Sequence, residues 1–382
     1  MKKLILKYLT NTITDAEQDK LSKWLSDSEN QKIFEAHIKN DYYLNTIYNE
    51  DDLHKAYNDI WDNILKQEKD VKRLRTTPWL KYKYIAAASI ALLISLTFIF
   101  NKDNTQISEP IIVNNNIKAG TDKATLTLDN GSVVALEKGQ IYTSDNLESN
   151  GEKIIYKPVN TLKDQIAHNY LTIPRGGHYL LKLSDGTQVW LNSESKLKYP
   201  VNFVEGKTRK VELIYGEAYF DVSPSILHSG SKFKVRTNTQ DIEVLGTEFN
   251  IKAYKDETNT YTTLVEGKVS INNAINTVIL SPGEQSITNA NDEEIKTVLV
   301  DIYDEIAWKD GVFSFKNKPL KDIAKVLSRW YDMDVIFIDK SLEKVRFKGV
   351  LGKNQSIEEI LSAIKSVSIN NYEINNKTII IK

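Results

Sequence analysis

The pattern of apolar and polar positions along the 382-residue chain changes twice. Helix-type spacing occupies the front, an uninterrupted apolar run follows at residues 84–100, and short alternating runs with glycine turns fill most of the remainder. The run reads YIAAASIALLISLTFIF and holds no charge. At ~1.5 Å per helical residue it spans about 25 Å, slightly less than a hydrocarbon core of ~30 Å, which predicts one transmembrane helix. A buried core helix is the alternative, but such helices usually carry a polar stripe.

The basic residues that flank this run lie almost entirely before it. They are Lys66, Lys69, Lys72, Arg73, Arg75, Lys81 and Lys83, whereas Lys102 alone follows before Lys118. Because lysine and arginine stay on the cytoplasmic side, we expect a cytoplasmic N-terminus and a C-terminus across the membrane. The predicted domains are a helical domain (1–67), a basic juxtamembrane linker (68–83), the transmembrane helix (84–100), a linker (101–110), an all-β domain (111–295) and an α+β domain (305–382).

The segment before the apolar run reads as short amphipathic helices. Thr14 and Glu17 form a capping box, and Leu21, Trp24 and Leu25 then recur at helical spacing. Four such helices, the first containing Tyr8, give a thin core that is marginal alone. Two interpretations stay open here, a small helical bundle without a partner and a helical clamp that completes its core on another protein.

Short alternating strands characterise the region from 111 to 290. An Asn-Gly turn at 130–131 between two strand-like runs predicts a β-hairpin, and the same unit recurs at 181–191. Further strands are predicted at 210–215, 217–222, 232–237, 242–245, 249–254, 261–265, 268–271 and 277–280. This spacing is typical of a sandwich, a barrel or a short β-solenoid, and the sequence leaves the three open.

The last part follows a different pattern. The predicted order is β-α-β-β-α-β-β, a compact α+β domain of the split βαβ type. Pro319 suits the first turn of one helix, and a second capping box at Ser356 and Glu359 opens the other. The predicted fold class is therefore multidomain: small all-α, one transmembrane helix, all-β, then α+β.

Composition and motifs argue against most enzyme classes. The net charge is −1, so no overall field attracts nucleic acid, and the absence of cysteine excludes disulfides and thiolate metal sites. Phosphate loops, nucleophile elbows and zinc motifs are missing from the sequence, and no carboxylate pair stands out. We therefore expect no cofactor, no metal and no turnover. The Gly246-Thr247 dipeptide reads as a strand-entry turn, although a strained turn there would let the Thr hydroxyl attack the preceding carbonyl.

Several motifs in order over residues 165–290 resemble the FecR-type anti-sigma regulators. They are Arg175-Gly176-Gly177, the segments 183–192, 197–200, 216–222, 245–251 and 265–269, and Leu280-Ser281-Pro282-Gly283-Glu284-Gln285. Residues 305–382 resemble the short domain found at the N-termini of secretins and TonB-dependent receptors. The front is similar, more weakly, to the family's cytoplasmic anti-sigma segment, and this similarity makes Tyr8, Leu21, Trp24 and Leu25 the candidate sigma-binding residues.

The resemblance implies a function in cell-surface signalling. Such proteins sit in the inner membrane with a periplasmic C-terminus and bind an extracytoplasmic-function sigma factor in the cytoplasm. The periplasmic part receives a signal from an outer-membrane TonB-dependent transducer, which regulates uptake genes for an iron chelate or a glycan. An open sheet edge in the last domain would receive the transducer by strand addition. The resemblance also implies self-cleavage at the Gly246-Thr247 bond.

Two other functions belong to different classes. A membrane-anchored periplasmic glycan-binding module would stack sugars on Trp190, Tyr199 and Tyr219. A membrane-tethered hydrolase would need a clustered acid pair, which the sequence does not display.

Overall fold

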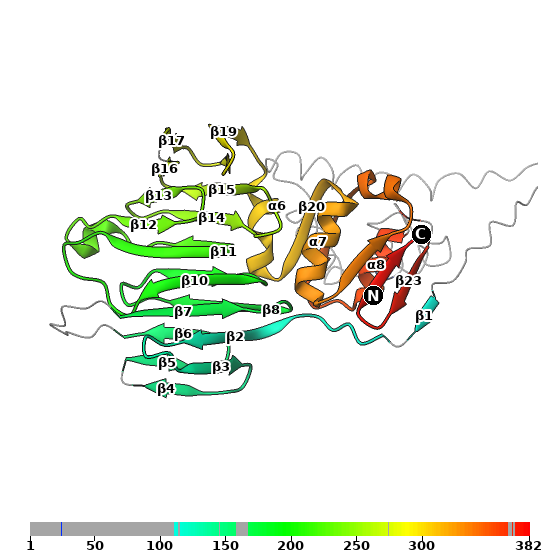
Figure 1. The fold of residues 1–382 in the computed structure, drawn as a ribbon, viewed down its shortest axis with the longest axis horizontal. Helices are drawn as coiled ribbons and strands as arrows, with labels where there is room; N and C mark the ends of the chain where they lie inside the picture. Colours follow the sequence, from blue (N-terminus) through cyan, green and yellow to red (C-terminus); the bar gives the residue numbers. More distant parts are fainter. Residues whose placement is uncertain are drawn as a thin grey trace, which may run out of the picture. The chain divides into compact units, whose positions relative to one another are not determined.

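The structure is a computed structural model that describes residues 111–382, except 114, 145, 158–166, 274, 366–368 and 370, together with Trp24. The chain divides into two compact units, Met1–Gln106 and Ile107–Lys382. The second unit holds an all-β part, residues 121–299, called the β-domain below. A smaller α+β part of the same unit, residues 301–382, is called the C-terminal domain (Figure 1).

The described residues of the β-domain are almost entirely strand. Its elements are β2 (Thr121–Thr127), β3 (Val133–Glu137), β4 (Tyr142–Ser144), β5 (Leu147–Ser149), β6 (Lys153–Tyr156), β7 (His168–Ile173), β8 (Gly177–Lys182), β9 (Gln188–Leu191), β10 (Ser195–Pro200), β11 (Arg209–Asp221), η1 (Ser225–His228), β12 (Phe233–Arg236), β13 (Asp241–Val244), β14 (Glu248–Ala253), β15 (Asn259–Glu266), β16 (Val269–Asn272), β17 (Thr277–Leu280), β18 (Glu284–Asn289) and β19 (Asp292–Leu299).

Two sheets share the long strand β11. Its first half, up to Tyr215, pairs with β10 and β12 in the sheet β3-β2-β7-β10-β11-β12-β13-β16-β17. Its second half, from Gly216, pairs with β9 and β14 in the sheet β4-β5-β6-β8-β9-β11-β14-β15-β18-β19. Gly216 lies at the crossing with a φ of 103°, a conformation that a side chain disfavours. The chain therefore crosses from one sheet to the other at this single residue.

Alternating side chains of both sheets meet in one apolar core. Strand β7, for example, alternates half-buried and buried positions along its whole length. A single cluster contains buried residues from both sheets, among them Leu171, Leu213, Phe220 and Phe249. The sequence left a sandwich, a barrel and a short β-solenoid open. The structure has two layers of stacked strands with their core between them. Both predicted hairpins are confirmed, since β2 pairs antiparallel with β3 and β8 with β9.

The C-terminal domain has the predicted order of elements. It comprises α6 (Ile302–Ile306), η2 (Ala307–Asp310), β20 (Val312–Pro319), α7 (Leu320–Tyr331), β21 (Asp334–Phe337), η3 (Lys340–Lys344), β22 (Arg346–Gly352), α8 (Ile357–Lys365), β23 (Tyr372–Asn375) and β24 (Thr378–Ile381). The predicted capping box is confirmed: the Glu359 amide donates to Ser356 Oγ at 3.2 Å, and the Ser356 amide donates to Glu359 Oε2 at 3.0 Å.

The strands of this domain form two separate ladders. β20 pairs with β22, and a four-stranded sheet has the order β1-β23-β24-β21. Its outermost strand, β1 (Ile111–Val113), precedes the β-domain in sequence yet pairs with β23 of the C-terminal domain. The split βαβ pattern that the element order suggests does not include this pairing of β1 with β23.

The predicted fold class needs correction. The described residues are mostly strand, with only the three α-helices α6, α7 and α8, and the small all-α domain and transmembrane helix of the prediction are not supported. No helix of the described residues is long and apolar enough to cross a membrane. The ranges 1–67 and 84–100 that carried those predictions lie outside the described residues, apart from the helical, half-buried Trp24. The prediction rested on apolar periodicity, which indicates only which face a helix would bury. Most of a helix's stability comes from the elements that it packs against, and periodicity does not reveal these.

Replacing Gly216 by alanine should destabilise the β-domain strongly. An added Cβ would lie 2.2 Å from Ser195 Oγ and 2.3 Å from Ser195 Cα, in addition to the cost of the positive φ. Gly139→Ala is the matched control, because Gly139 has a φ of 83° and nothing within 4 Å of the new Cβ. In urea unfolding of the fragment Ile107–Lys382, the control should lose about 1 kcal/mol of unfolding free energy, the cost of a side chain in the left-handed region. A comparable loss for Gly216→Ala would contradict a tightly packed crossing at this residue.

Candidate functional site at the interface of the two domains

Two arginines cross the interface between the β-domain and the C-terminal domain in opposite directions. Arg175 leaves the turn between β7 and β8, and Arg329 leaves helix α7. They are linked by backbone as well, because the Gly176 amide donates to the Arg329 carbonyl at 2.7 Å. Gly176 has a φ of 66°, and this conformation lets the turn approach the end of α7 closely. The Arg-Gly-Gly motif thus forms an inter-domain contact.

Arg175 contacts the end of helix α7 and the start of β21. Its Nη2 donates to the carbonyls of Ser328, at 3.0 Å, and of Met333. Its guanidinium also lies 3.6 Å from Asp332 Oδ1 and 3.5 Å from Asp334 Oδ1. A positive group at the carbonyl end of a helix is favourable, because the last carbonyls carry partial negative charge. The arginine therefore holds this helix end to the β-domain.

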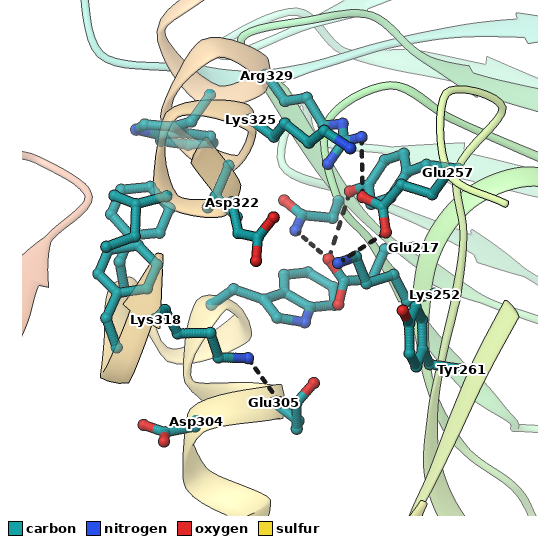
Figure 2. A pocket seen from close by; sticks show the side chains of 18 of the residues that line it. Glu217, Lys252, Glu257, Tyr261, Asp304, Glu305, Lys318, Asp322, Lys325 and Arg329 are labelled. Atoms are coloured by element: carbon teal, nitrogen blue, oxygen red, sulfur yellow. Dashed lines mark hydrogen bonds and ion pairs between the residues drawn. The ribbon is translucent and has the colours of Figure 1, made fainter. Parts of the chain in front are cut away.

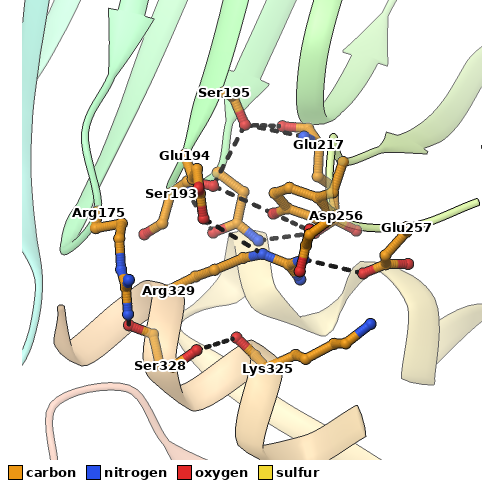
Figure 3. A network of polar contacts seen from close by, with 12 residues as sticks. Arg175, Ser193, Glu194, Ser195, Glu217, Asp256, Glu257, Lys325, Ser328 and Arg329 are labelled. Carbon is orange, nitrogen blue, oxygen red and sulfur yellow. Dashed lines mark hydrogen bonds and ion pairs between the residues drawn. The ribbon is translucent and has the colours of Figure 1, made fainter. Parts of the chain in front are cut away.

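Arg329 points the other way and is enclosed by acidic and aromatic side chains (Figure 3). Its Nη2 lies 2.5 Å from Asp256 Oδ1 and 3.1 Å from Glu257 Oε1, and its Nε lies 3.6 Å from Glu194 Oε2. The guanidinium carbon stands 3.6 Å from the centre of the Tyr254 ring. A planar guanidinium can pair and stack at the same time, which a lysine ammonium does not reproduce.

A second cluster lies beside it, around Trp330. The Trp330 ring stacks on His178 with centroids 5.2 Å apart, and Lys353 Nζ lies 3.7 Å from the Trp330 ring centre. His178 Nε2 is 2.7 Å from Asp122 Oδ1, so the β-domain contributes a hydrogen-bonded pair of side chains to this cluster. Burial lowers the pKa of Lys353 to about 7, and burial together with the Lys353 charge lowers the pKa of His178.

A cavity of about 440 Å³ opens between the same two domains. Figure 2 shows Glu217, Lys252 and Tyr261 of the β-domain on one side, with Glu305 and Lys318 of the C-terminal domain facing them. Lys318 Nζ is 2.9 Å from Glu305 Oε1, and Lys252 Nζ is 3.0 Å from Glu257 Oε2. The cavity wall is thus lined by ion pairs.

Glu217 is the buried carboxylate of this cavity. It accepts hydrogen bonds from Asn192 at 2.8 Å, from Asn250 at 3.0 Å and from the Tyr254 hydroxyl at 3.3 Å. Burial raises the pKa of Glu217, while the Lys252 charge and the two amides act in the opposite direction. All three donors belong to the β-domain, so this carboxylate orders the β-domain side of the cavity. The described residues contain no group of ligating side chains that could hold a metal ion.

The sequence-predicted site residues lie elsewhere. Gly246 and Thr247 connect β13 to β14, and Gly246 has a φ of 151°. The Thr247 side chain is buried, and its hydroxyl donates to the Lys268 carbonyl at 3.0 Å. Nothing in the structure tests self-cleavage. Tyr8, Leu21 and Leu25 lie outside the described residues, so the sigma-binding assignment stays a prediction.

The aromatic residues of the glycan alternative do not form an open surface. Tyr199 is fully buried and Tyr219 is 2% exposed. The Tyr199 hydroxyl lies 3.1 Å from that of Tyr156, and Tyr219 packs edge-on against Trp190 with centroids 5.7 Å apart. Tyr199 belongs to the core of the β-domain, whereas Lys309 of the C-terminal domain lies 5.1 Å from the centre of the Tyr219 ring. By contrast, sequence reasoning missed Arg329, Glu217 and Lys353. Of these three, only Glu217 lies in a motif named above, the segment 216–222.

Comparison with known proteins places these features in a family. The model described as FecR protein matches residues 169–270, and the model described as FecR, C-terminal, matches residues 312–381. A crystal structure of a candidate anti-sigma factor from Parabacteroides distasonis is 30% identical, covers 56% of this chain and 98% of that chain, and gives a TM-score of 0.50. A second crystal structure with the same description has the same identity and coverage and a TM-score of 0.49. No curated protein matches the chain.

Both family matches fall inside the β-domain and the C-terminal domain, one in each. The similar crystal structure is matched over nearly its whole length at 30% identity. This chain belongs to the FecR family.

Replacing Arg329 by methionine should destabilise the fragment Ile107–Lys382 by about 2–4 kcal/mol. Removing one partner of a buried ion pair costs ~3–5 kcal/mol, and the cost is smaller here because Asp256 is half exposed. Arg329→Lys should recover only part of the lost stability. Lysine keeps the positive charge but lacks the planar guanidinium that pairs with several carboxylates at once. Lys325→Met on the same helix is the control, expected within about 0.5 kcal/mol of wild type in urea unfolding. Equal effects at the two positions would contradict the proposed contact.

The pH dependence of stability should report Lys353. Its pKa is lowered to about 7 from an ordinary value of 10.5, so between these pH values the unfolded chain holds a proton that the folded chain has released. This contribution therefore makes the folded state more stable as pH rises, by up to about 1.4 kcal/mol per pH unit. Urea unfolding at pH 7, 8 and 9 should show a flatter profile for Lys353→Met than for wild type. Parallel profiles would show that the amine is not held neutral.

Proposed function

We propose that this protein is an anti-sigma factor that carries a signal across the inner membrane. The observation that supports this most is the match to a candidate anti-sigma factor at 30% identity over 98% of that chain, together with membership of the FecR family. Its function is then to bind and release a partner.

The proposed topology follows from charge. The uncharged run at 84–100 anchors the chain in the inner membrane, and the basic residues before it keep the N-terminus in the cytoplasm. The β-domain and the C-terminal domain then lie in the periplasm. In this arrangement the N-terminal segment binds an extracytoplasmic-function sigma factor through Tyr8, Leu21, Trp24 and Leu25. Tyrosine and tryptophan are enriched among the residues that dominate binding energy at protein interfaces.

The proposed signal comes from the outer membrane. The periplasmic extension of a TonB-dependent transducer contacts the C-terminal domain, whose order of elements resembles the short domain of secretins and TonB-dependent receptors. Transport of an iron chelate or a glycan would be the regulated process. The two arginines favour such a relay, because they tie the C-terminal domain to the β-domain by ion pairs and backbone hydrogen bonds.

Co-purification tests the proposed partner. Full-length protein carrying an affinity tag, extracted from the native host with a mild detergent, should bring down one sigma factor in near-equal amount by mass spectrometry. The double variant Leu21→Ala/Leu25→Ala should lower that recovery at least tenfold, whereas Lys23→Ala should leave it unchanged. Recovery of no sigma factor with the wild-type protein would refute the anti-sigma function.

Self-cleavage is a separate proposal, taken from the family resemblance at Gly246-Thr247. The close packing of Gly267 against Thr247 Oγ1 and the Gly246 carbonyl favours it, since the hydroxyl is confined near the bond. Wild type should yield a fragment that begins at Thr247, and Thr247→Ala should remain one chain on a gel. N-terminal sequencing identifies the fragment. A wild-type protein that remains intact in membranes of the native host would count decisively against cleavage.

A further inference from the structure

A second cavity lies on one sheet of the β-domain and is lined mainly by cations. Strands β7, β10, β11 and β12 lie side by side there (Figure 1). The cavity has a volume of about 280 Å³, and its polar lining consists of His168, Lys198, Lys210, Glu212, Lys234 and Arg236. Four cations therefore share this space with one carboxylate. All the described residues that line it belong to the β-domain, so it is separate from the inter-domain cavity.

The lysines of this cavity lie on the outer face of the sheet. Their neighbours along the three strands, Leu197, Val211 and Val235, belong to the apolar core. Successive side chains of a strand point to opposite faces of a sheet, so the lysines beside these core residues point outward. The cavity is therefore a hollow in the solvent-facing side of the sheet.

The strand register brings three lysines together. Lys210 of β11 is directly opposite Lys234 of β12, and neighbouring strands are ~4.8 Å apart. Lys198 of β10 is opposite Glu212, two residues along β11 from Lys210, so Lys198 and Lys210 are diagonal neighbours at ~7–8 Å. Side chains as long as lysine reach across both separations. The three ammonium groups can thus approach a common point in the cavity.

The nearby acids leave an excess of positive charge at this point. Lys234 Nζ is 2.9 Å from Asp241 Oδ2 and 3.6 Å from Glu243 Oε1, both on the next strand, β13. Lys198 Nζ is 3.9 Å from the single carboxylate of the cavity. No carboxylate of the described residues lies within 4.0 Å of Lys210 Nζ. The β11 side of the cluster is therefore the part that lacks a counter-charge.

This arrangement costs stability in the protein alone. Like charges directly opposite each other in a sheet are destabilising, and Lys210 and Lys234 are such a pair. An anion between them would remove the repulsion. Lysine ammonium groups act as point charges with several donors each, and they suit phosphate oxygens, whereas a planar carboxylate is matched best by an arginine fork. The one arginine here, Arg236, is engaged by Asp241 at 3.2 Å.

We propose that Lys198, Lys210 and Lys234 form a binding site for the phosphate group of a soluble ligand. Three ammonium groups from three strands surround one tetrahedral anion from different directions. The hollow shape favours a soluble phosphate ester over a lipid, because a bilayer presents a flat array of headgroups. The site does not depend on the sigma-binding or transducer-binding functions proposed above.

Lysine labelling tests the site in full-length protein in a non-ionic detergent. Inorganic phosphate, added at constant ionic strength in exchange for chloride, should slow acylation of Lys210 and Lys234 by an amine-reactive ester at least fivefold. Peptide mass spectrometry would measure the rate at each lysine. Lys153, exposed on β6 of the other sheet, should react at an unchanged rate. Absence of protection, or equal protection of Lys153, would overturn the proposal.

The variant Lys210→Met separates binding from folding. Because it removes one member of the like-charge pair, the variant without phosphate should be at least as stable as wild type in thermal unfolding. Phosphate at ten times its dissociation constant should raise the wild-type midpoint by about 2–4 °C and leave the variant's midpoint unchanged. A variant that is markedly less stable without phosphate would contradict the repulsion from which the site is inferred.

The matched control is Lys296→Met. Lys296 is an exposed lysine of β19 that lies 3.8 Å from Asp292 Oδ2, and its replacement should leave the phosphate response at the wild-type level. Phosphate also stabilises folded proteins generally through its exclusion from their surface, and that effect acts on every variant alike. An equal rise of the midpoint in wild type, Lys210→Met and Lys296→Met would therefore overturn the site.

Dioctanoyl phosphatidic acid, a water-soluble lipid, distinguishes the two sources of a phosphate group. Inorganic phosphate should protect Lys210 from acylation as fully as this lipid does, because the cavity recognises the phosphate alone. Protection by the lipid without protection by inorganic phosphate would assign the cavity to a membrane headgroup and overturn the soluble ligand.

Discussion

The exchange of Arg175 and Arg329 is the contact on which the arrangement of the two domains depends. Each guanidinium leaves its own domain and finds its partners in the other, and the 2.7 Å hydrogen bond from the Gly176 amide to the Arg329 carbonyl lies between them. Ion pairs at a surface contribute little to stability, but Arg329 has only 5% of its side chain exposed. A buried charge of this kind fixes one geometry, because any displacement leaves it unpaired.

The rest of the interface depends on that geometry. With helix α7 held in place, Trp330 can stack on His178, and Lys353 Nζ lies 3.7 Å from the centre of the Trp330 ring and 3.5 Å from His178 Nδ1. Glu217 and the ion pairs of the cavity wall occupy the remaining space between the domains. A small domain fixed in this way moves with its neighbour, which suits a protein that receives a signal at one end. The strand β1 is the exception, because it is fixed at Ile117 and only lightly paired beyond it.

Local sequence signals predicted much of the β-domain and the C-terminal domain. The Asn-Gly hairpin, the capping box at Ser356 and the helix that begins next to Pro319 depend on residues close in sequence, and each is present in the structure. The two-layered arrangement was not predictable, because it depends on β11 crossing between sheets at Gly216. The site was missed for the same reason: Arg175 and Arg329 are adjacent only after folding. The pairing of β1 with β23 joins residues from opposite ends of the second unit. The alternation of apolar and polar residues in a three-residue strand is too short to predict which residues it pairs with.

Native-state hydrogen exchange of the fragment Ile107–Lys382 tests most directly whether the β-domain and the C-terminal domain behave as one body. Exchange of amides in β11 and in α7 would be followed by mass spectrometry at increasing, sub-denaturing urea concentrations. If the two arginines hold the domains together, both elements should approach the same opening free energy with the same dependence on urea. Exchange of α7 through an opening several kcal/mol below that of β11 would show that the two domains separate independently, and would contradict a single body.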